Sequence, residues 1–295
     1  MNNSSRYDEF KERVVEIRKI LNNWKQLKYN IADNRNKHRE FAKNINLDFE
    51  ILEKTYELYE PNLIISCYTF MEQLVKEFIY ETLNKNENSI EIKNFIDYQI
   101  PREKFSPDIS IKSIKTIISR YIPKEKRENM KIKLIWEYIE ETEEKNSYSE
   151  LIKRRHKYAH EGKYYPIEIK GYENCVNLME YFTCEFELLN YDIRNRIEIH
   201  KLSEEISKSI NKLKENDKRR EENNRKYIIK HAKIIREQAK KLSKILEKIR
   251  NNSIIFNKMF TKLENLKKID LRYSTIKIKE ILNDNSIRFK NLNEE

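Results

Sequence analysis

The chain has 295 residues, a net charge of +11, and 38% hydrophobic against 37% charged residues. This length allows one or two domains with a real core, and the composition is more polar than the roughly 45–50% apolar content of an average globular protein. No apolar run approaches the roughly 20 residues that a membrane-spanning helix needs. The first residues also lack the apolar core of a signal peptide. We therefore expect a cytoplasmic protein that does not bind membranes.

The positive charge favours a polyanionic partner, and nucleic acid is the simplest such partner. A general compositional bias towards Lys, seen together with abundant Ile and Asn, would also account for this charge. Three cysteines, Cys67, Cys175 and Cys184, lie in apolar stretches without C-x-x-C spacing, which predicts buried free thiols rather than a disulfide framework. The sequence has no zinc-ligand spacing, no P-loop and no Rossmann glycine pattern, so we expect neither a metal nor a cofactor.

The scarcity of helix-breaking residues predicts an all-α fold. The chain contains two glycines and five prolines, and neither residue type occurs after Gly171. Helical patterns before residue 195 predict the following helices: 7–28, 33–59, 61–79, 132–144, 147–161 and 172–191. The stretch 86–125 contains three of the prolines and predicts an irregular insert with short helices.

Two signals mark the ends of the helix predicted over 147–161. Ser147 and Glu150 have the spacing of a capping box, so we expect the helix to begin at Ser147. Gly162 is expected to end the helix in a left-handed cap.

These patterns divide the chain into an N-terminal helical body, 1–195, and a helical extension, 196–295. Seven residues of the extension alternate by four and three, as in a coiled coil: Ile228, Ala232, Ile235, Ala239, Leu242, Leu246 and Ile249. After an interruption at Ser253, Phe256, Phe260 and Leu263 continue the register. This seam requires a partner helix, either in the same chain or in a second copy. The segment 271–292 fits a helix or a hairpin.

Arg155 and His160 form the motif with the clearest chemistry. An arginine binds a phosphate bidentately and stabilises its developing charge, and a histidine transfers a proton as general base or acid. Together they meet the needs of RNA cleavage without a metal, with a 2′,3′-cyclic phosphate and a 5′-hydroxyl as products. Residues five apart on an ideal helix lie about 140° apart, which favours a composite site built from two copies.

The string from Leu151 to Gly162 is similar to the Leu-Val-x-x-Arg-Asn-x-(apolar)-Ala-His-x-Gly string of prokaryotic HEPN nucleases. The stretch 64–77, which includes Glu72, resembles an early core helix of that superfamily. The resemblance covers roughly 10–195 and is nearest to stand-alone nucleases of bacterial defence and toxin loci. It implies a HEPN-like helical bundle and a metal-independent endoribonuclease that acts as a homodimer.

Several positions leave alternatives open. His156 takes the place of the usual asparagine and either assists the site or is a solvated neighbour. Arg154 with His160 also fits a looser form of the family pattern, so the functional arginine is Arg154 or Arg155. Glu72 either orients Arg155 or lies at a helix edge. Gly162 stands where the nucleotidylated toxin branch has a tyrosine, so that form of control is not expected.

Two other functions are compatible with the sequence. The first is a non-catalytic HEPN-type module that binds RNA or a nucleotide, or assembles with another effector. The second is a structural coiled-coil protein in which the Arg-His string is accidental. A nuclease would also need restraint, which makes a regulatory protein a further candidate partner. The remaining histidines lie in charged helical stretches and are expected at the surface: His38, His200 and His231.

Overall fold

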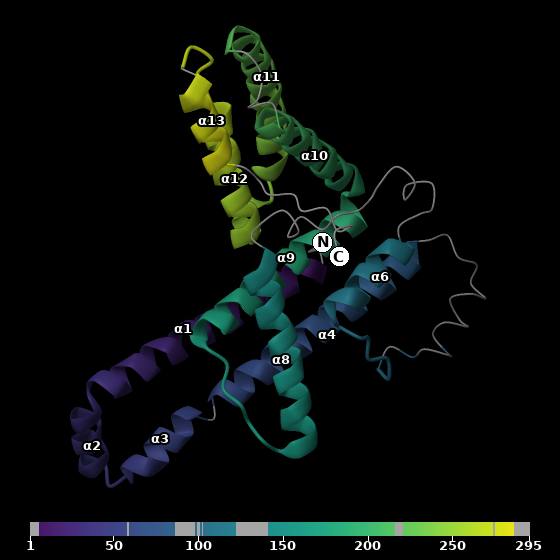
Figure 1. Cartoon of the computed structure of the whole chain (residues 1–295). Coiled ribbons are helices and arrows are strands. Elements are labelled where there is room, and N and C mark those ends of the chain that lie inside the picture. Colours follow the sequence, from purple (N-terminus) through teal and green to yellow (C-terminus); the bar gives the residue numbers. More distant parts are fainter. Residues whose placement is uncertain are drawn as a thin grey trace. The chain divides into compact units, whose positions relative to one another are not determined.

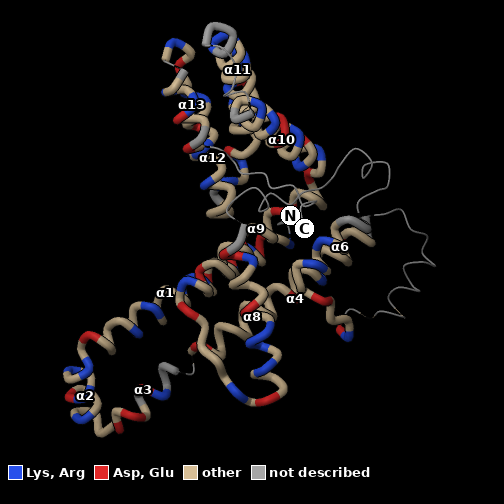
Figure 2. The backbone as a smooth tube through the Cα atoms, viewed as in Figure 1, with Lys and Arg blue, Asp and Glu red and all other residues tan. Residues whose placement is uncertain are grey.

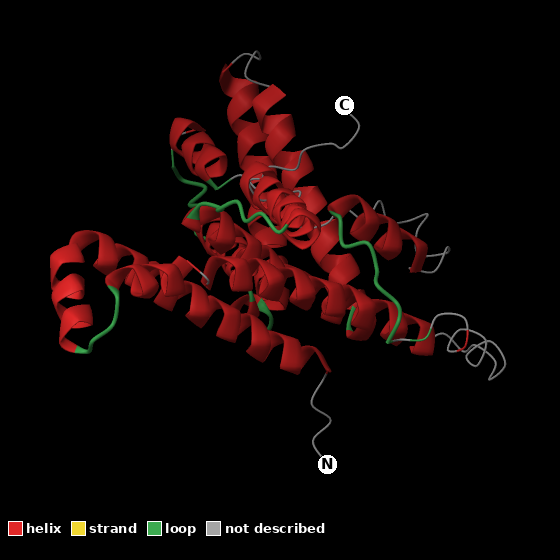
Figure 3. Ribbon diagram, turned by 90° about the horizontal axis from the view of Figure 1, so that it is seen from below, coloured by secondary structure: helices red, strands yellow, loops and turns green. Residues whose placement is uncertain are grey.

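The computed structural model describes residues 6–57, 59–85, 98, 101, 103–121, 141–215, 221–273 and 275–285. All regular structure in these ranges is helical, which confirms the all-α prediction (Figures 1 and 3). The helices are α1 (Arg6–Asp33), α2 (Arg35–Asn44), α3 (Phe49–Glu57), α4 (Tyr59–Lys85), α6 (Ile111–Tyr121), α8 (Glu141–Glu161), α9 (Ile169–Tyr191), α10 (Ile193–Glu215), α11 (Glu221–Leu246), the 3₁₀ turn η2 (Arg250–Asn252), α12 (Ile254–Lys267) and α13 (Thr275–Asp284).

The described residues form two compact units. The first extends to Tyr121 and also contains Thr142–Thr183, and the second contains the described residues from Cys184 onward. The division lies inside α9, whereas the sequence patterns divide the chain at residue 195. Of the insert predicted over 86–125, α6 and the segment that precedes it are described.

The core of the first unit is built from the apolar faces of α1, α4 and α9. The α1 stripe predicted by helical spacing is buried at Val14, Ile17, Leu21 and Trp24. Phe10 of α1 meets Phe70 of α4 edge to face, with 5.6 Å between ring centroids. The prediction of a central, buried helix after Pro61 is confirmed, because α4 is among the most buried helices described.

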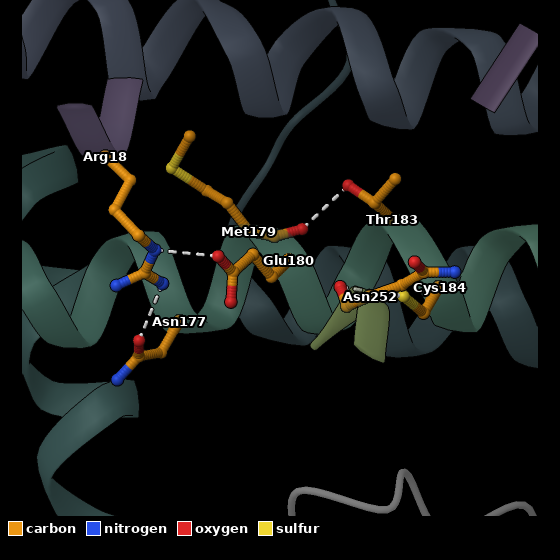
Figure 4. A network of polar contacts seen from close by, with 7 residues as sticks. All are labelled: Arg18, Asn177, Met179, Glu180, Thr183, Cys184 and Asn252. Atoms are coloured by element: carbon orange, nitrogen blue, oxygen red, sulfur yellow. Dashed lines mark hydrogen bonds and ion pairs between the residues drawn. The ribbon is translucent and has the colours of Figure 1, made fainter. Parts of the chain in front are cut away.

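Polar contacts join α1 to α9 at the edge of this core. Arg18 donates from Nε to Glu180 at 2.7 Å and from Nη2 to Asn177 at 2.9 Å (Figure 4). Lys25 donates to Glu173 at 2.8 Å, about two helical turns away from Arg18. α9 is therefore held to α1 along several turns.

The three cysteines are buried and form no disulfide, as predicted. Burial raises the pKa of Cys67 to about 12 and also raises the pKa of Cys175. Cys184, in the second unit, donates from Sγ to the Asn252 carbonyl oxygen at 3.3 Å (Figure 4). Because the thiolate is the nucleophile, the raised pKa values make Cys67 and Cys175 structural residues.

The predicted start of α8 is wrong. The helix begins at Glu141 and passes through Ser147, whose Oγ accepts a hydrogen bond from Asn174 Nδ2 of α9 at 3.1 Å. Glu150 accepts from Arg154 Nε at 2.6 Å, an i,i+4 pair within the helix. Both side chains of the supposed capping box thus have other partners. Most of the helix predicted over 132–144 lies outside the described residues.

The other end of α8 agrees with the sequence. α8 ends at Glu161, and Gly162 has a φ of +66° and donates its N–H to the Tyr158 carbonyl oxygen at 3.1 Å.

The single helix predicted over 33–59 is wrong, because α2 and α3 are separate there. Asn46 has a φ of +53°, a left-handed conformation that does not continue a helix.

The second unit is an intrachain helical bundle in which the predicted seam is buried. The seam residues from Ile228 to Leu246 are at most 1% exposed, and α11 packs against both α10 and α12. Contacts of Ser243 with Glu264 and of Arg250 with Phe260 show that α12 runs antiparallel to α11. The seam therefore finds its partners within the chain, and the register does not continue straight past Ser253. In the segment 271–292, the described part contains the helix α13.

Two buried polar features lie in the same bundle. Arg196 Nε donates to Glu185 Oε1 at 2.6 Å, and both side chains are fully buried. His200 and His231 are buried as well, so their predicted surface position is wrong. His231 lies three residues after Ile228 and four before Ile235, which puts it on the buried face of α11.

Candidate functional site

The candidate site is at the C-terminal end of α8, where the Arg-His motif meets Tyr68 of α4. The Arg155 guanidinium lies over the Tyr68 ring, with 4.2 Å from Cζ to the ring centroid. His156 meets the same ring edge-on, with 6.0 Å between centroids. Tyr68 is buried among core residues. Tyr68 therefore contacts both Arg155 and His156, which are consecutive in the chain.

His160 lies next to His156 rather than next to Arg155. The two imidazole rings are stacked, with 6.3 Å between centroids and 11° between planes. This stacking follows from the i,i+4 spacing, which brings side chains to the same face of a helix. Both histidines are exposed and Arg155 is half-buried. Because α8 is helical through Glu161, Arg155 and His160 point about 140° apart in one chain.

The segment 103–110 before α6 contains Glu103 and Asp108 and is called the acidic segment. Asp108 lies close enough to Tyr68 and His156 to interact with both electrostatically. Asp108 accepts hydrogen bonds from the Ser110 N–H at 2.8 Å and from the hydroxyl of Ser113. Those hydrogen bonds, with a smaller contribution from the charge of His156, hold the pKa of Asp108 below its usual range. Tyr148 of α8 donates to the Ile109 carbonyl oxygen at 2.9 Å and fixes the segment to the helix.

Glu72, predicted to orient Arg155 or to lie at a helix edge, is half-exposed on α4 one turn after Tyr68. Its carboxylate accepts a hydrogen bond from Ser106 Oγ, so it holds the acidic segment to α4. Burial raises the pKa of the Tyr68 phenol. The positive charge of Arg155 lowers this pKa, and the negative charges of Glu72 and Asp108 raise it further. The phenol is therefore neutral near pH 7 and is no proton acceptor there.

The two arginines of the motif have different surroundings. Arg154 pairs with Glu150, and its guanidinium lies 5.5 Å from the ring centroid of Tyr165, in the loop between α8 and α9. Lys157 approaches the same ring at 5.1 Å. Arg155 instead contacts Tyr68, beside His156. Of the two, Arg155 is the arginine that shares a neighbour, Tyr68, with His156.

Sequence reasoning missed Tyr68 and Asp108. Tyr68 precedes Glu72 by four residues on a helix predicted to be buried, and nothing in that pattern relates it to a motif more than eighty residues later. Asp108 did carry a signal, because an aspartate followed by Ser110 and Ser113 is typical of a helix start.

Within the described ranges, no group of three or more His, Cys, Asp or Glu side chains is arranged to hold a metal ion. The helices in those ranges also include none with the length and apolar character needed to cross a membrane. Comparisons with protein families, with curated proteins and with solved structures find no match to this chain.

Proposed function

We propose that this chain is a metal-independent endoribonuclease of the HEPN type, with Arg155 and His160 as its central residues. The observation that carries the proposal is the cluster at the end of α8: two stacked imidazoles, with a guanidinium held beside them on Tyr68. The functional setting is taken from the resemblance of the motif. It is a cytoplasmic defence or toxin system of bacteria, with a regulatory protein as a further partner.

The stacked histidines supply the two proton transfers that the reaction needs. One neutral imidazole takes the proton of the ribose 2′-hydroxyl, whose oxygen then attacks the adjacent phosphorus. The bond from phosphorus to the 5′-oxygen breaks, and a protonated imidazole donates a proton to that leaving oxygen. Histidine suits both roles, because its ordinary pKa of about 6.5 allows either form near neutral pH. His160 is the principal proton carrier in this scheme, and His156 assists it.

Arg155 binds the scissile phosphate and stabilises the charge that develops on it. Tyr68 restricts the guanidinium to one region, and a positioned donor stabilises the transition state better than a mobile one. We further propose that the chain acts as a homodimer. Arg155 and His160 diverge on one helix, so a phosphate between them is best reached by Arg155 of one copy and His160 of the other.

The test compares RNA cleavage by the wild type, Arg155→Ala and His160→Ala in the presence of a chelator. Each substitution should lower the cleavage rate by roughly 100-fold or more and leave the helical content unchanged, because neither side chain is part of the core. Lys145→Ala removes an exposed positive charge near the start of the same helix and is the matched control. The RNA ends should be a 2′,3′-cyclic phosphate and a 5′-hydroxyl.

A second candidate is an RNA- or nucleotide-binding module without catalysis. It is favoured by the different neighbours of Arg155 and His160, since the two do not form a pair in one chain. Binding of RNA without cleavage, with full affinity in His160→Ala, would support this candidate and contradict the nuclease. Cleavage that disappears with chelator would also contradict the metal-independent mechanism.

A further inference from the structure

Beside the proposed catalytic cluster, α8 presents a second group of residues that the mechanism does not use. Tyr165 is 37% exposed in the loop between α8 and α9. Arg154 and Lys157, which are three residues apart and share a face of α8, lie 5.5 and 5.1 Å from the centroid of its ring. We propose that this group is a stacking subsite for one base of single-stranded RNA. The inference rests on the proposed function, because it assumes that RNA is the substrate.

Tyr165 is exposed in a loop that is anchored to the protein on both sides of this residue. On one side, the Tyr164 ring meets Tyr158 edge to face at 6.4 Å, and its hydroxyl lies 3.5 Å from that of Tyr172. On the other side, Ile167 is buried. Tyr164 and Ile167 are thus held against the protein, whereas Tyr165 and Pro166 between them stay at the surface. An exposed aromatic ring in a loop that is anchored on both sides offers a surface on which a base stacks.

The surrounding charge suits a nucleic-acid strand. Residues 153–163 contain five Lys and Arg side chains and one carboxylate, that of Glu161. Lys and Arg are visible along this end of α8 in Figure 2. Arg154 is partly neutralised by Glu150, whereas Lys157 is exposed and able to turn toward a phosphate. On binding, a base takes the place of the ammonium group over the ring, and the ammonium group pairs with the backbone of the strand.

The position of the subsite fits a neighbouring nucleotide of the cleaved strand. Arg154 and Arg155 are consecutive, so their Cα atoms are about 3.8 Å apart. Their side chains face Tyr165 and Tyr68, respectively. Because consecutive side chains leave a helix about 100° apart, a strand with its phosphate at Arg155 meets Tyr165 with a nearby base where it curves around this end of α8. The base must be unpaired to stack there, because both faces of a base inside a duplex are covered by its neighbours.

The test measures binding of full-length protein to a short unstructured RNA and to the same RNA as a duplex. His160→Ala is the parent, so that no cleavage disturbs the measurement. Adding Tyr165→Ala should weaken binding of the single strand about tenfold and change duplex binding little. Tyr165→Phe keeps the ring and should bind like the parent. Tyr29→Ala, which removes an exposed tyrosine of α1, is the matched control.

The inference is overturned if Tyr165→Ala binds the single strand as well as Tyr29→Ala does, or loses single strand and duplex equally. If Tyr165→Ala lowers the helical content, Tyr165→Leu replaces it, since leucine keeps apolar packing without a stacking face. The two proposals fail separately. Wild-type protein that binds single strands through Tyr165 but cuts no RNA contradicts the nuclease alone. A nuclease whose single-strand affinity does not depend on Tyr165 contradicts the subsite alone.

Discussion

His231 is a buried histidine of α11 whose surroundings disfavour the charged imidazolium. Burial lowers its pKa from the ordinary value of 6.5, and the positive charges of Lys212 and Lys230 lower it further. As the pH falls, the unfolded chain therefore takes up this proton before the folded chain does. The stability contributed by neutral His231 is complete above about pH 6.5 and decreases as the pH falls toward the folded-state pKa.

We predict that His231→Gln reduces the loss of stability of the second unit on mild acidification. The measurement is the free energy of unfolding in urea at several values between about pH 5 and pH 8, and the expected change is a shallower slope against pH. Lys241→Gln is the control, because it places the same side chain at an exposed position of α11 and removes no histidine, so the slope should be unchanged. Equal slopes in wild type and His231→Gln would contradict the prediction.

At the scale of single elements, α11 shows how small residues set the distance between helices. Ala232 and Ala239 are fully buried in the seam, and α10 and α12 both pack against α11. A methyl group at these positions lets neighbouring helices approach closely. Longer side chains there require the helices to separate or the side chains to leave their preferred rotamers.

We predict that Ala239→Leu lowers the free energy of unfolding by about 1–3 kcal/mol, although leucine is a good helix former, because the added atoms overpack the seam. Lys241→Leu introduces the same side chain at an exposed position of α11 and should change stability little. Denaturant unfolding of the two variants gives the comparison. If Ala239→Leu proves as stable as Lys241→Leu, the seam has more room than the structure indicates.

At the scale of the whole molecule, the proposed homodimer makes a prediction that single-chain catalysis does not. In a symmetric dimer with composite sites, a mixture of Arg155→Ala and His160→Ala chains contains dimers in which one of two sites keeps both residues. About half of the dimers in an equal mixture are of this kind, so about a quarter of the wild-type activity should return.

The measurement is the RNA cleavage rate of the two inactive variants, first separately and then after unfolding and refolding together. Sedimentation of the wild type provides the control, since a dimer is required for the effect. Activity that stays absent in a mixture known to contain mixed dimers would contradict the composite site.

Local patterns in the sequence were sufficient for several features of this chain. The lack of Gly and Pro after Gly171 predicted helices, and the stripe from Val14 to Trp24 predicted the buried face of α1. Gly162 predicted the end of α8, since a left-handed cap depends on one residue and the turn before it. These features depend on residues that are close together in the chain, so periodicity and capping chemistry are sufficient to predict them.

Only the tertiary structure decided which segments pack against the apolar faces of the predicted helices. The heptad of α11 required a partner helix, and packing supplied α10 and α12 of the same chain. Tyr68 and Asp108 came to border the Arg-His motif because α4 and the segment before α6 fold against α8. Periodicity determines which side of a helix is buried, but the partner of that side depends on segments far away in sequence. The sequence by itself therefore identified the motif, and the fold decided that Arg155 lies on Tyr68 while His160 stacks on His156.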